Sequence, residues 1–477
     1  MIALTPLLKK MSKKPLYVQL YQYIKEEIEK GAIYSGTLLP SIRQLSQHLE
    51  VSKNTVEGAY QQLLAEGYVE SIPRVGLRVL SLEDTLASYR QIESDHTAAK
   101  QAASNEGYNN TETNELSIRY DFIYGDVDVE HFPMKLWNKY LQKALTVENS
   151  KLLMYGDPFG DRGLREELSQ YLLQARGFTC SSEQIVICSG TQHAISILSQ
   201  LLSLQGSLVA IEEPGYDGVR SVFINQACKV IPVPLEADGI SVSDLQASNA
   251  KAVYLTPSHQ LPNGMIMPIQ KRLMLLHWAY EHHTYIIEDD YDSEFRYQGQ
   301  PVPALKALDK RESVIYLGTF SKCFLPSIRV SYLVLPPMLV QLYKLRLYNY
   351  NQASSPIIQR ALYLFMRNGD FERHIRRMRK IYHLKHKTLL NAIDRYLGDK
   401  VEVIGEKSGL HILLKVPGQM DHELIKKALN YGVQVYSTSK FWYNKQQHDP
   451  STLMLGFGSL SVEEIEDGIR LLREAIR

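Results

Sequence analysis

The sequence has little cysteine, almost no net charge and no long hydrophobic run. Its four cysteines are Cys180, Cys188, Cys228 and Cys323, and no two of them form a C-x-x-C pair, so a zinc site is not expected. No apolar run approaches the roughly 20 residues that span a bilayer. Residues 1–14 lack an apolar segment followed by a small-residue cleavage site. We therefore expect a reduced, cytoplasmic protein with no metal centre and no membrane partner.

The charges balance over the whole chain but not at its N-terminal end. The 477 residues carry 53 Lys or Arg against 52 Asp or Glu, a formal net charge of +1. Residues 1–80 alone hold ten Lys or Arg against seven Asp or Glu, a net charge of +3. This is a mild basic bias, which by itself gives weak support for a nucleic-acid partner. The length exceeds one compact core, so we expect at least two domains.

Residues 15–80 show the pattern of three short helices followed by a hairpin. Apolar residues recur at helical spacing in the first segment, and Ser41 and Ser52 are placed to cap a second and a third helix. Alternating residues at 68–72 and 77–80, on either side of a short turn, predict two strands. Three helices and a hairpin make a winged helix-turn-helix.

Three regions follow from the changes of pattern along the chain. Residues 1–80 form the winged helix-turn-helix, and the polar residues 81–118, which lack a sustained apolar face, are predicted to be a linker. From 119 to 477, short apolar strands alternate with helices, which predicts an α/β domain with a mostly parallel sheet. An amphipathic helix from about 370, short strands and a last helix at 462–476 predict a smaller α+β subdomain.

Three features of the long domain together meet the chemical needs of pyridoxal 5′-phosphate (PLP). Lys322 follows an apolar strand and offers an amine that can form an imine with an aldehyde. Asp289 ends another strand, where a carboxylate can keep a pyridine nitrogen protonated. The turn Ser189-Gly190-Thr191-Gln192 lies between a strand and a helix, and its N–H groups suit a phosphate.

Four more residues complete this constellation. Tyr291 is placed to hydrogen-bond the ring oxygen of PLP, and Tyr216 to stack on the ring. Thr319 and Arg329 flank Lys322 at positions −3 and +7 and add a hydroxyl and a fixed positive charge. Taken singly, each residue has a plainer explanation as a turn, a helix cap or solvated surface. Their joint occurrence in this order makes the plainer explanations much weaker.

Residues 119–477 resemble the fold-type I PLP-dependent aminotransferases. The motifs that carry the resemblance are Ser189-Gly190-Thr191-Gln192, Glu213-Pro214-Gly215-Tyr216, Pro262-Asn263-Gly264, Asp289-Asp290-Tyr291 and Thr319-Phe320-Ser321-Lys322 with Arg329. The resemblance implies PLP bound through Lys322. Tyr155 resembles the tyrosine that reaches the cofactor phosphate of the neighbouring subunit, which implies a dimer with shared sites.

Two positions depart from the enzyme pattern. Leu261 stands where the enzymes usually carry an asparagine that bonds the ring oxygen, and His259 or Gln260 are possible substitutes. Met454 stands in the last strand, where the enzymes carry an arginine that clamps the substrate carboxylate. We consider three residues as candidates to bind an effector in place of the missing groups: Arg220, Lys440 and His259. Each of them could equally serve another purpose.

The N-terminal pattern resembles the GntR-type winged helix-turn-helix. It implies that Arg43 contacts a DNA phosphate and that Arg74 and Arg78 of the wing contact phosphate or the minor groove. The residues that begin the recognition helix and enter the major groove are Ser52, Lys53, Asn54 and Thr55.

Further along the same helix, Tyr60, Leu63 and Leu64 are expected to be core. A winged helix kept as a protein-interaction module is the alternative. One such domain makes few phosphate contacts, so specific binding should need a dimer that reads two half-sites.

A GntR-like head, a polar linker and an aminotransferase-like body together resemble the GabR-like regulators of the bacterial MocR family. The resemblance implies a head-to-tail homodimer that binds PLP and double-stranded operator DNA and senses an amine, an amino acid or PLP itself. As a hypothesis, an effector amine would displace Lys322 from an internal aldimine and form an external aldimine, with little or no turnover. The alternative is an active aminotransferase with an accessory DNA-binding head, which Lys322 and Asp289 support and Met454 disfavours. A scaffold without DNA binding is the weakest interpretation, because both sites keep their chemistry.

Overall fold

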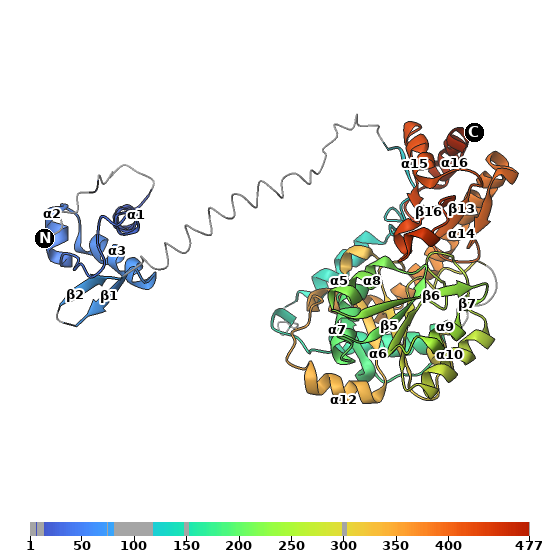
Figure 1. The fold of residues 1–477 in the computed structure, drawn as a ribbon, viewed down its shortest axis with the longest axis horizontal. Helices are drawn as coiled ribbons and strands as arrows, with labels where there is room; N and C mark the ends of the chain where they lie inside the picture. The colour runs from blue at the N-terminus through green and yellow to red at the C-terminus, as the bar shows by residue number, and fades with distance from the viewer. Residues whose placement is uncertain are drawn as a thin grey trace. The chain divides into compact units, whose positions relative to one another are not determined.

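The computed structural model describes residues 14–73, 75–80, 118–146, 152–297 and 303–476, together with Pro6. They form two compact units, one before and one after residues 81–117 in the sequence (Figure 1). Arg74 and all but the last residue of the predicted linker lie outside the described residues. None of the helices in the described ranges has the length and apolar character needed to cross a membrane.

The N-terminal unit consists of three helices and a two-stranded hairpin, as expected. Its elements are α1 (Leu16–Glu29), α2 (Ile42–His48), α3 (Lys53–Ala65), β1 (Val69–Ile72) and β2 (Gly76–Val79), with β1 and β2 antiparallel. The predicted caps are confirmed. The Ser41 hydroxyl accepts the Gln44 N–H at 3.3 Å while the Gln44 side chain accepts the Ser41 N–H, and the Ser52 hydroxyl accepts the Thr55 N–H at 3.2 Å. Each cap satisfies helix N–H groups that would otherwise lack a partner.

The core of this unit lies between α1 and α3. Leu20 and Ile24 of α1 and Val56 and Leu63 of α3 are fully buried, and each contributes about 1.5–3 kcal/mol through burial of apolar surface. Leu64 corrects one expectation, because its side chain is 42% exposed. Consecutive residues of a helix lie about 100° apart around its axis, so burying Leu63 turns its neighbour towards solvent.

The large part of the C-terminal unit is built on an eight-stranded sheet. In spatial order the strands are β4 (Ile185–Cys188), β11 (Ser331–Val334), β10 (Val314–Thr319), β9 (Tyr285–Asp290), β8 (Ala252–Leu255), β5 (Leu208–Glu213), β6 (Lys229–Glu236) and β7 (Gly239–Ile240). The five strands from β10 to β6 run parallel, while β11 is antiparallel to both its neighbours and β7 to β6. This confirms the predicted α/β fold with a mostly parallel sheet.

Helices pack against this sheet and bury it in apolar clusters on its two faces. They are α5 (Met134–Ala144), α6 (Arg162–Arg176), α7 (Thr191–Leu201), α8 (Asp217–Asn225), α9 (Val242–Ala247), α10 (Ile269–Glu281), α11 (Leu305–Leu308), α12 (Pro337–Arg346) and α13 (Pro356–Arg367). Because the central strands are parallel, their carboxyl ends meet at one edge, where α/β proteins place ligands.

The remainder of the unit forms the predicted α+β subdomain. A four-stranded antiparallel sheet has the order β12 (Glu402–Ile404), β13 (His411–Lys415), β16 (Thr452–Gly456) and β15 (Tyr436–Ser437). Strand β3 (Tyr120–Asp121) pairs in parallel with β14 (Val433–Gln434) and so connects the start of the C-terminal unit to this subdomain. Its helices are α14 (Asp370–Tyr396), α15 (Asp421–Asn430) and α16 (Val462–Ile476), which Figure 1 shows grouped with β13 and β16.

Candidate functional site

A pocket of about 200 Å³ opens at the carboxyl ends of β8, β9 and β10. Eight of the residues expected at the cofactor line it: Thr191, Gln192, Tyr216, Asp289, Tyr291, Thr319, Lys322 and Arg329. Six residues that were not expected to bind the cofactor also line it: Tyr124, Tyr254, Thr256, Leu261, Ser321 and Pro326. The strands therefore bring together residues that lie up to 205 positions apart in the chain.

Lys322 lies just after β10 and its amine faces the N-terminal part of the unit. Its Nζ donates a hydrogen bond to the Gly125 carbonyl at 2.8 Å and lies 4.4 Å from the centre of the Tyr124 ring. Burial lowers the pKa of Lys322 to about 8; Asp292 opposes this shift, while Lys440 adds to it. A lower pKa increases the fraction of neutral, nucleophilic amine at neutral pH.

Asp289 is the penultimate residue of β9, and only 3% of its surface is exposed. Its Oδ2 accepts a hydrogen bond of 2.5 Å from the Tyr254 hydroxyl, whereas its Oδ1 has no hydrogen-bond partner among the described residues. Burial raises the pKa of Asp289 to about 7, with a further contribution from Asp290, although the Tyr254 hydrogen bond opposes the shift. A buried carboxyl oxygen that accepts no hydrogen bond suits an N–H donor.

The turn after β4 meets Arg329. Gly190 has φ +82°, which glycine adopts without strain, and a Cβ there would lie 2.2 Å from Nη2 of Arg329. Helix α7 begins at Thr191, so its first N–H groups open towards the same space. Thr319 and Ser321, whose hydroxyls are 2.9 Å apart, border it. A helix N-terminus beside a guanidinium is an arrangement that binds phosphate or carboxylate.

A buried polar layer lies behind Tyr291. The Tyr291 hydroxyl is 3.0 Å from Nδ1 of His259, and the Asp292 carboxylate is 2.9 Å from the same nitrogen. His411 packs against both Tyr124 and His259, and burial lowers its pKa to about 3. One ligand atom from each of His259, Asp292 and His411 lies within 4.8 Å of the others, a grouping that the sequence spacing did not reveal.

The three candidate effector residues are not gathered at one point. Arg220 donates hydrogen bonds to the carbonyls of Lys440, at 2.6 Å, and Phe441, at 3.2 Å. Lys440 is exposed, and His259 is engaged with Asp292. Met454 is 1% exposed and belongs to an apolar cluster with Leu261, Tyr291, Leu413 and Phe441.

Tyr254 and Tyr124 were missed for different reasons. Tyr254 is the third residue of β8, and β8 pairs with β9, which carries Asp289. The sequence predicts both strands, so a residue near the end of β8 could have been proposed as a neighbour of Asp289. Tyr124 belongs to no strand motif and reaches Lys322 only through the tertiary fold.

In the N-terminal unit, the described residues expected at DNA lie on α2, at the start of α3 and on the hairpin. Arg43, Lys53 and Asn54 are exposed, and Thr55 is half-buried beside its Ser52 cap. Arg78 forms an ion pair across the hairpin with Glu70, its Nε donating at 2.8 Å. Arg74 lies outside the described residues.

Comparison with known proteins matches both units. Residues 16–79 match the family "Bacterial regulatory proteins, gntR family", and residues 124–470 match "Aminotransferase class I and II". The chain is 40% identical to the HTH-type transcriptional regulator YdeL of Bacillus subtilis, covering 99% of each chain. It is 32% identical to the probable rhizopine catabolism regulatory protein MocR of Rhizobium meliloti, covering 97% of this chain and 94% of that protein.

The solved structures extend this likeness to the fold. The Pyrococcus horikoshii kynurenine aminotransferase, in complex with PMP, aligns with a TM-score of 0.69 and 28% identity over 76% of this chain and 91% of that one. Fold and matches together define a transcriptional regulator with a GntR-type DNA-binding head and a fold-type I aminotransferase-like domain. Full-length similarity to proteins of this architecture shows that the chain belongs to the MocR family.

Proposed function

We propose that this regulator depends on PLP and senses an amine or amino acid, or PLP itself, at Lys322. The supporting observation is one pocket that holds a lysine amine, a buried carboxyl group and an arginine beside a helix N-terminus. These groups match the aldehyde, the pyridine nitrogen and the phosphate of PLP. PLP is also what the family implies: the Pyrococcus horikoshii enzyme was solved with PMP, and Thermus thermophilus LysN with N-(5′-phosphopyridoxyl)-L-leucine.

The pocket fits this cofactor in two respects. The open Oδ1 of Asp289 would accept the ring N–H, and a negative charge there would be favoured by the ring's positive charge. A side chain at position 190 would push the Arg329 guanidinium aside, so glycine there lets the guanidinium lie beside the turn. The phosphate would be held by Ser189, Gly190, Thr191, Gln192 and Arg329, and the ring by Tyr216, Tyr291 and Thr319.

The sensing event is an exchange of amines at the cofactor. When bound, PLP supplies an aldehyde carbon that takes up a primary amine. Lys322, with its pKa lowered to about 8, is the amine that this chain provides. Once an effector amine replaces it, the freed Lys322 ammonium can hydrogen-bond the Gly125 carbonyl and lie over the Tyr124 ring, contacts it has in this structure.

The effector would be recognised near the segment 439–444. Arg220 holds the carbonyls of this segment, and the Glu213 carboxylate accepts the N–H groups of Tyr443, at 2.7 Å, and Asn444, at 2.9 Å. An effector acid that competes for Arg220 or Lys440 would loosen the segment from the large subdomain. His259 would contribute through Tyr291, which it contacts.

We also propose a head-to-tail homodimer in which Tyr155 reaches the neighbouring pocket. The Tyr155 side chain is 87% exposed and lies outside the lining of its own pocket. Leu153 and Met154 beside it are 68% and 73% exposed, an apolar stretch that an interface would cover. Two heads per dimer would read two half-sites of double-stranded operator DNA in the cytoplasm, through Arg43, Arg78 and the start of α3.

An active aminotransferase with an accessory head remains the second candidate, because Lys322 and Asp289 would serve turnover equally well. Met454, buried among apolar side chains, offers no positive charge for a substrate carboxylate. Conversion of an amino donor and a keto acid, well above the rate with free PLP, would favour this alternative.

The direct test is a PLP titration followed by absorbance. The wild-type chain should develop the visible band of lysine-bound cofactor, and Lys322→Ala should lose it. Lys400→Ala, which changes an exposed lysine outside the pocket, is the matched control and should behave as wild type. An unchanged spectrum in Lys322→Ala would refute the assignment.

A further inference from the structure

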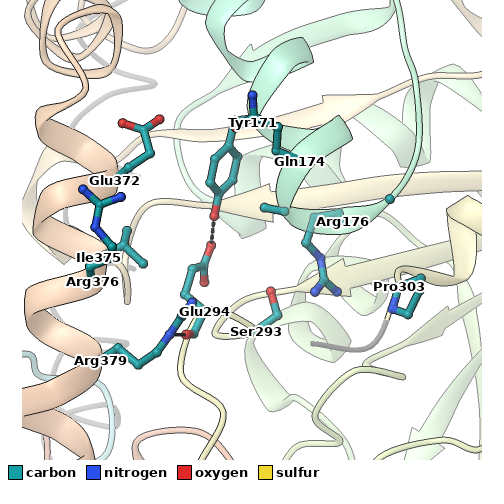
Figure 2. Close-up of a pocket in the computed structure, with 12 residues that line it drawn as sticks. Tyr171, Gln174, Arg176, Ser293, Glu294, Pro303, Glu372, Ile375, Arg376 and Arg379 are labelled. Atoms are coloured by element: carbon teal, nitrogen blue, oxygen red, sulfur yellow. Dashed lines mark hydrogen bonds between the residues drawn. The ribbon is translucent and has the colours of Figure 1, made fainter. Parts of the chain in front are cut away.

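A second cavity, of about 500 Å³, lies in the aminotransferase-like unit and shares no lining residue with the pocket around Lys322. Its walls come from the C-terminal end of α6, the segment after β9 and the first turns of α14, as Figure 2 shows. The volume falls within the range of about 300–1,000 Å³ that is usual for small-molecule sites. None of the functions proposed above uses it.

The floor of the cavity is a fixed ion pair. Arg176 is 4% exposed, and its Nε lies 2.5 Å from Oδ2 of Asp290, while Nη2 donates to the Ser258 hydroxyl at 2.9 Å. The Tyr316 hydroxyl donates to the same Asp290 oxygen at 2.6 Å. These contacts compensate the Arg176 charge and hold the floor rigid, so recognition must come from the walls.

One wall presents carboxyl groups. The Glu294 carboxylate accepts a hydrogen bond of 2.8 Å from the Tyr171 hydroxyl, and burial raises the pKa of Glu294 to about 7, helped by the charge on Asp290. Glu372 reaches the same space from α14, and its buried Oε2 receives no hydrogen bond from any described residue. A buried acceptor of this kind normally has a partner, and an ammonium group would give Glu372 Oε2 the donor that it lacks.

The neighbouring wall presents guanidinium groups. Arg376 and Arg379 project from α14, four and seven positions after Glu372, so all three share one face of the helix. Nε of Arg379 donates to the Glu294 backbone carbonyl at 2.9 Å, which orients its guanidinium along the rim (Figure 2). Arginine is the side chain best suited to hold a carboxylate with paired hydrogen bonds.

We propose that this cavity binds a free amino acid as a zwitterion. Its ammonium group would lie against Glu372 and its carboxylate against Arg376, one helical turn further along α14, with its side chain over Tyr171 and Ile375. The site goes beyond the amine exchange proposed at Lys322, because binding here needs no cofactor.

The cavity has a short physical connection to the cofactor pocket. Asp289 and Asp290 are consecutive on β9, so their side chains point to opposite sides of the strand. Asp289 lines the pocket, while Asp290 pairs with Arg176 and its charge raises the pKa of Asp289. An amino acid bound beside Glu294 and Arg176 would therefore change the field at Asp289, and by linkage the cofactor would change the affinity of the cavity.

The test uses the full chain saturated with PLP and then reduced with sodium borohydride, which fixes the cofactor on Lys322 and blocks amine exchange. The standard L-amino acids are titrated one at a time by calorimetry, and we expect at least one to bind once per chain. The methyl ester and the N-acetyl derivative of that amino acid, which each lack one charge, should bind at least about tenfold more weakly, as expected for the loss of a charged hydrogen bond.

The variants locate the site. Arg376→Ala and Glu372→Gln should each weaken binding about tenfold or more, whereas Arg377→Ala, an exposed neighbour that does not line the cavity, should leave the affinity unchanged. If no amino acid binds the reduced chain, or if all three variants bind alike, the proposal is wrong. If PLP never attaches to Lys322, the proposed sensing function fails, but the same titration still tests the cavity.

Discussion

Two ionisable residues, Lys322 and Asp289, give the pocket its character. Burial lowers the pKa of the lysine to about 8 and raises that of the aspartate to about 7. Both shifts have one cause, because removing a group from water disfavours its charged form, whichever sign it has. The pocket thus places two groups that change protonation near neutral pH around one ligand, which is a property of functional sites.

The first prediction concerns the reactivity of Lys322. Its acylation in the PLP-free chain should increase with pH around a midpoint near 8, against about 10.4 for an ordinary lysine. Lys440→Ala should move the midpoint to higher pH because a like charge is removed, and Asp292→Asn to lower pH because an opposite charge is removed. Mass spectrometry of the Lys322 peptide across a pH series measures this. Equal midpoints for Lys322 and the exposed Lys400 would contradict it.

The second prediction concerns Asp289 and stability. The carboxyl group keeps its proton up to about pH 7 in the folded chain but loses it near pH 3.8 when unfolded. Between these values the folded state binds more protons, so the free energy of unfolding falls as pH rises. Asp289→Asn removes one such group, so the decrease in the free energy of unfolding with pH should become smaller by about 1.4 kcal/mol per pH unit.

Urea unfolding of the PLP-free chain between pH 5 and 7 checks this second prediction. Glu212 and Glu294, whose pKa values burial also raises to about 7, should keep part of the slope in the variant. An Asp289→Asn slope equal to that of the wild-type chain would mean that Asp289 is ionised throughout this range.

At the scale of elements, the local residue pattern was enough to predict a helix or strand that buries one face along its own length. The predicted last helix, 462–476, coincides with α16, and the predicted strands 68–72 and 77–80 agree with β1 and β2 to within one residue at each end. Strand β11 (Ser331–Val334) was not predicted. Its four residues follow directly on the motif around Arg329, and it is defined by antiparallel pairing with β10 and β4 rather than by a local signal.

The same distinction separates the predicted and unpredicted parts of the site. Lys322, Asp289 and the 189–192 turn could be predicted because each lies at or just after the carboxyl end of a strand and carries a distinct chemistry. Tyr124 lines that pocket and His411 packs against Tyr124, and both are placed there by tertiary contacts with no sequence motif. The Arg78–Glu70 pair was also missed, because only the hairpin register places the two opposite each other.

The third prediction concerns the elements of the head. Arg43 on α2 is exposed, and Arg43→Ala should weaken binding to all DNA sequences and reduce the slope of log affinity against log salt by about 1. Arg78→Ala should have a smaller effect, because Arg78 shares its charge with Glu70 across the hairpin. Affinity measured over a salt series with operator and random duplexes distinguishes the two, and Glu70→Gln should strengthen the contribution of Arg78. A larger loss for Arg78→Ala than for Arg43→Ala would reverse this assignment.

At the scale of the whole molecule, a ligand at the body can affect the head only through states that differ in their affinity for it. Within the body, the segment 439–444 is a physical link between subdomains, because Arg220 and Glu213 of the large part hold its backbone. If two such bodies share their pockets, an event at one pocket is felt by both chains, and the spacing of the two heads becomes the quantity that the effector controls.

The last prediction tests that sharing. If Tyr155 serves the neighbouring pocket, Tyr155→Phe should weaken PLP binding about tenfold or more, through loss of a hydrogen bond to a charged group. Mixed dimers of Tyr155→Phe and Lys322→Ala chains then separate the two arrangements. If Tyr155 acts across the interface, the one pocket that keeps Lys322 receives Tyr155 from the other chain and regains wild-type affinity. Half the sites of the dimer then recover. If Tyr155 acts within its own chain, the pocket that keeps Lys322 still lacks the Tyr155 hydroxyl, and no site recovers. Affinity-tagged heterodimers titrated with PLP measure which occurs, and the exposed position of Tyr155, outside its own pocket, leads us to expect recovery at half the sites.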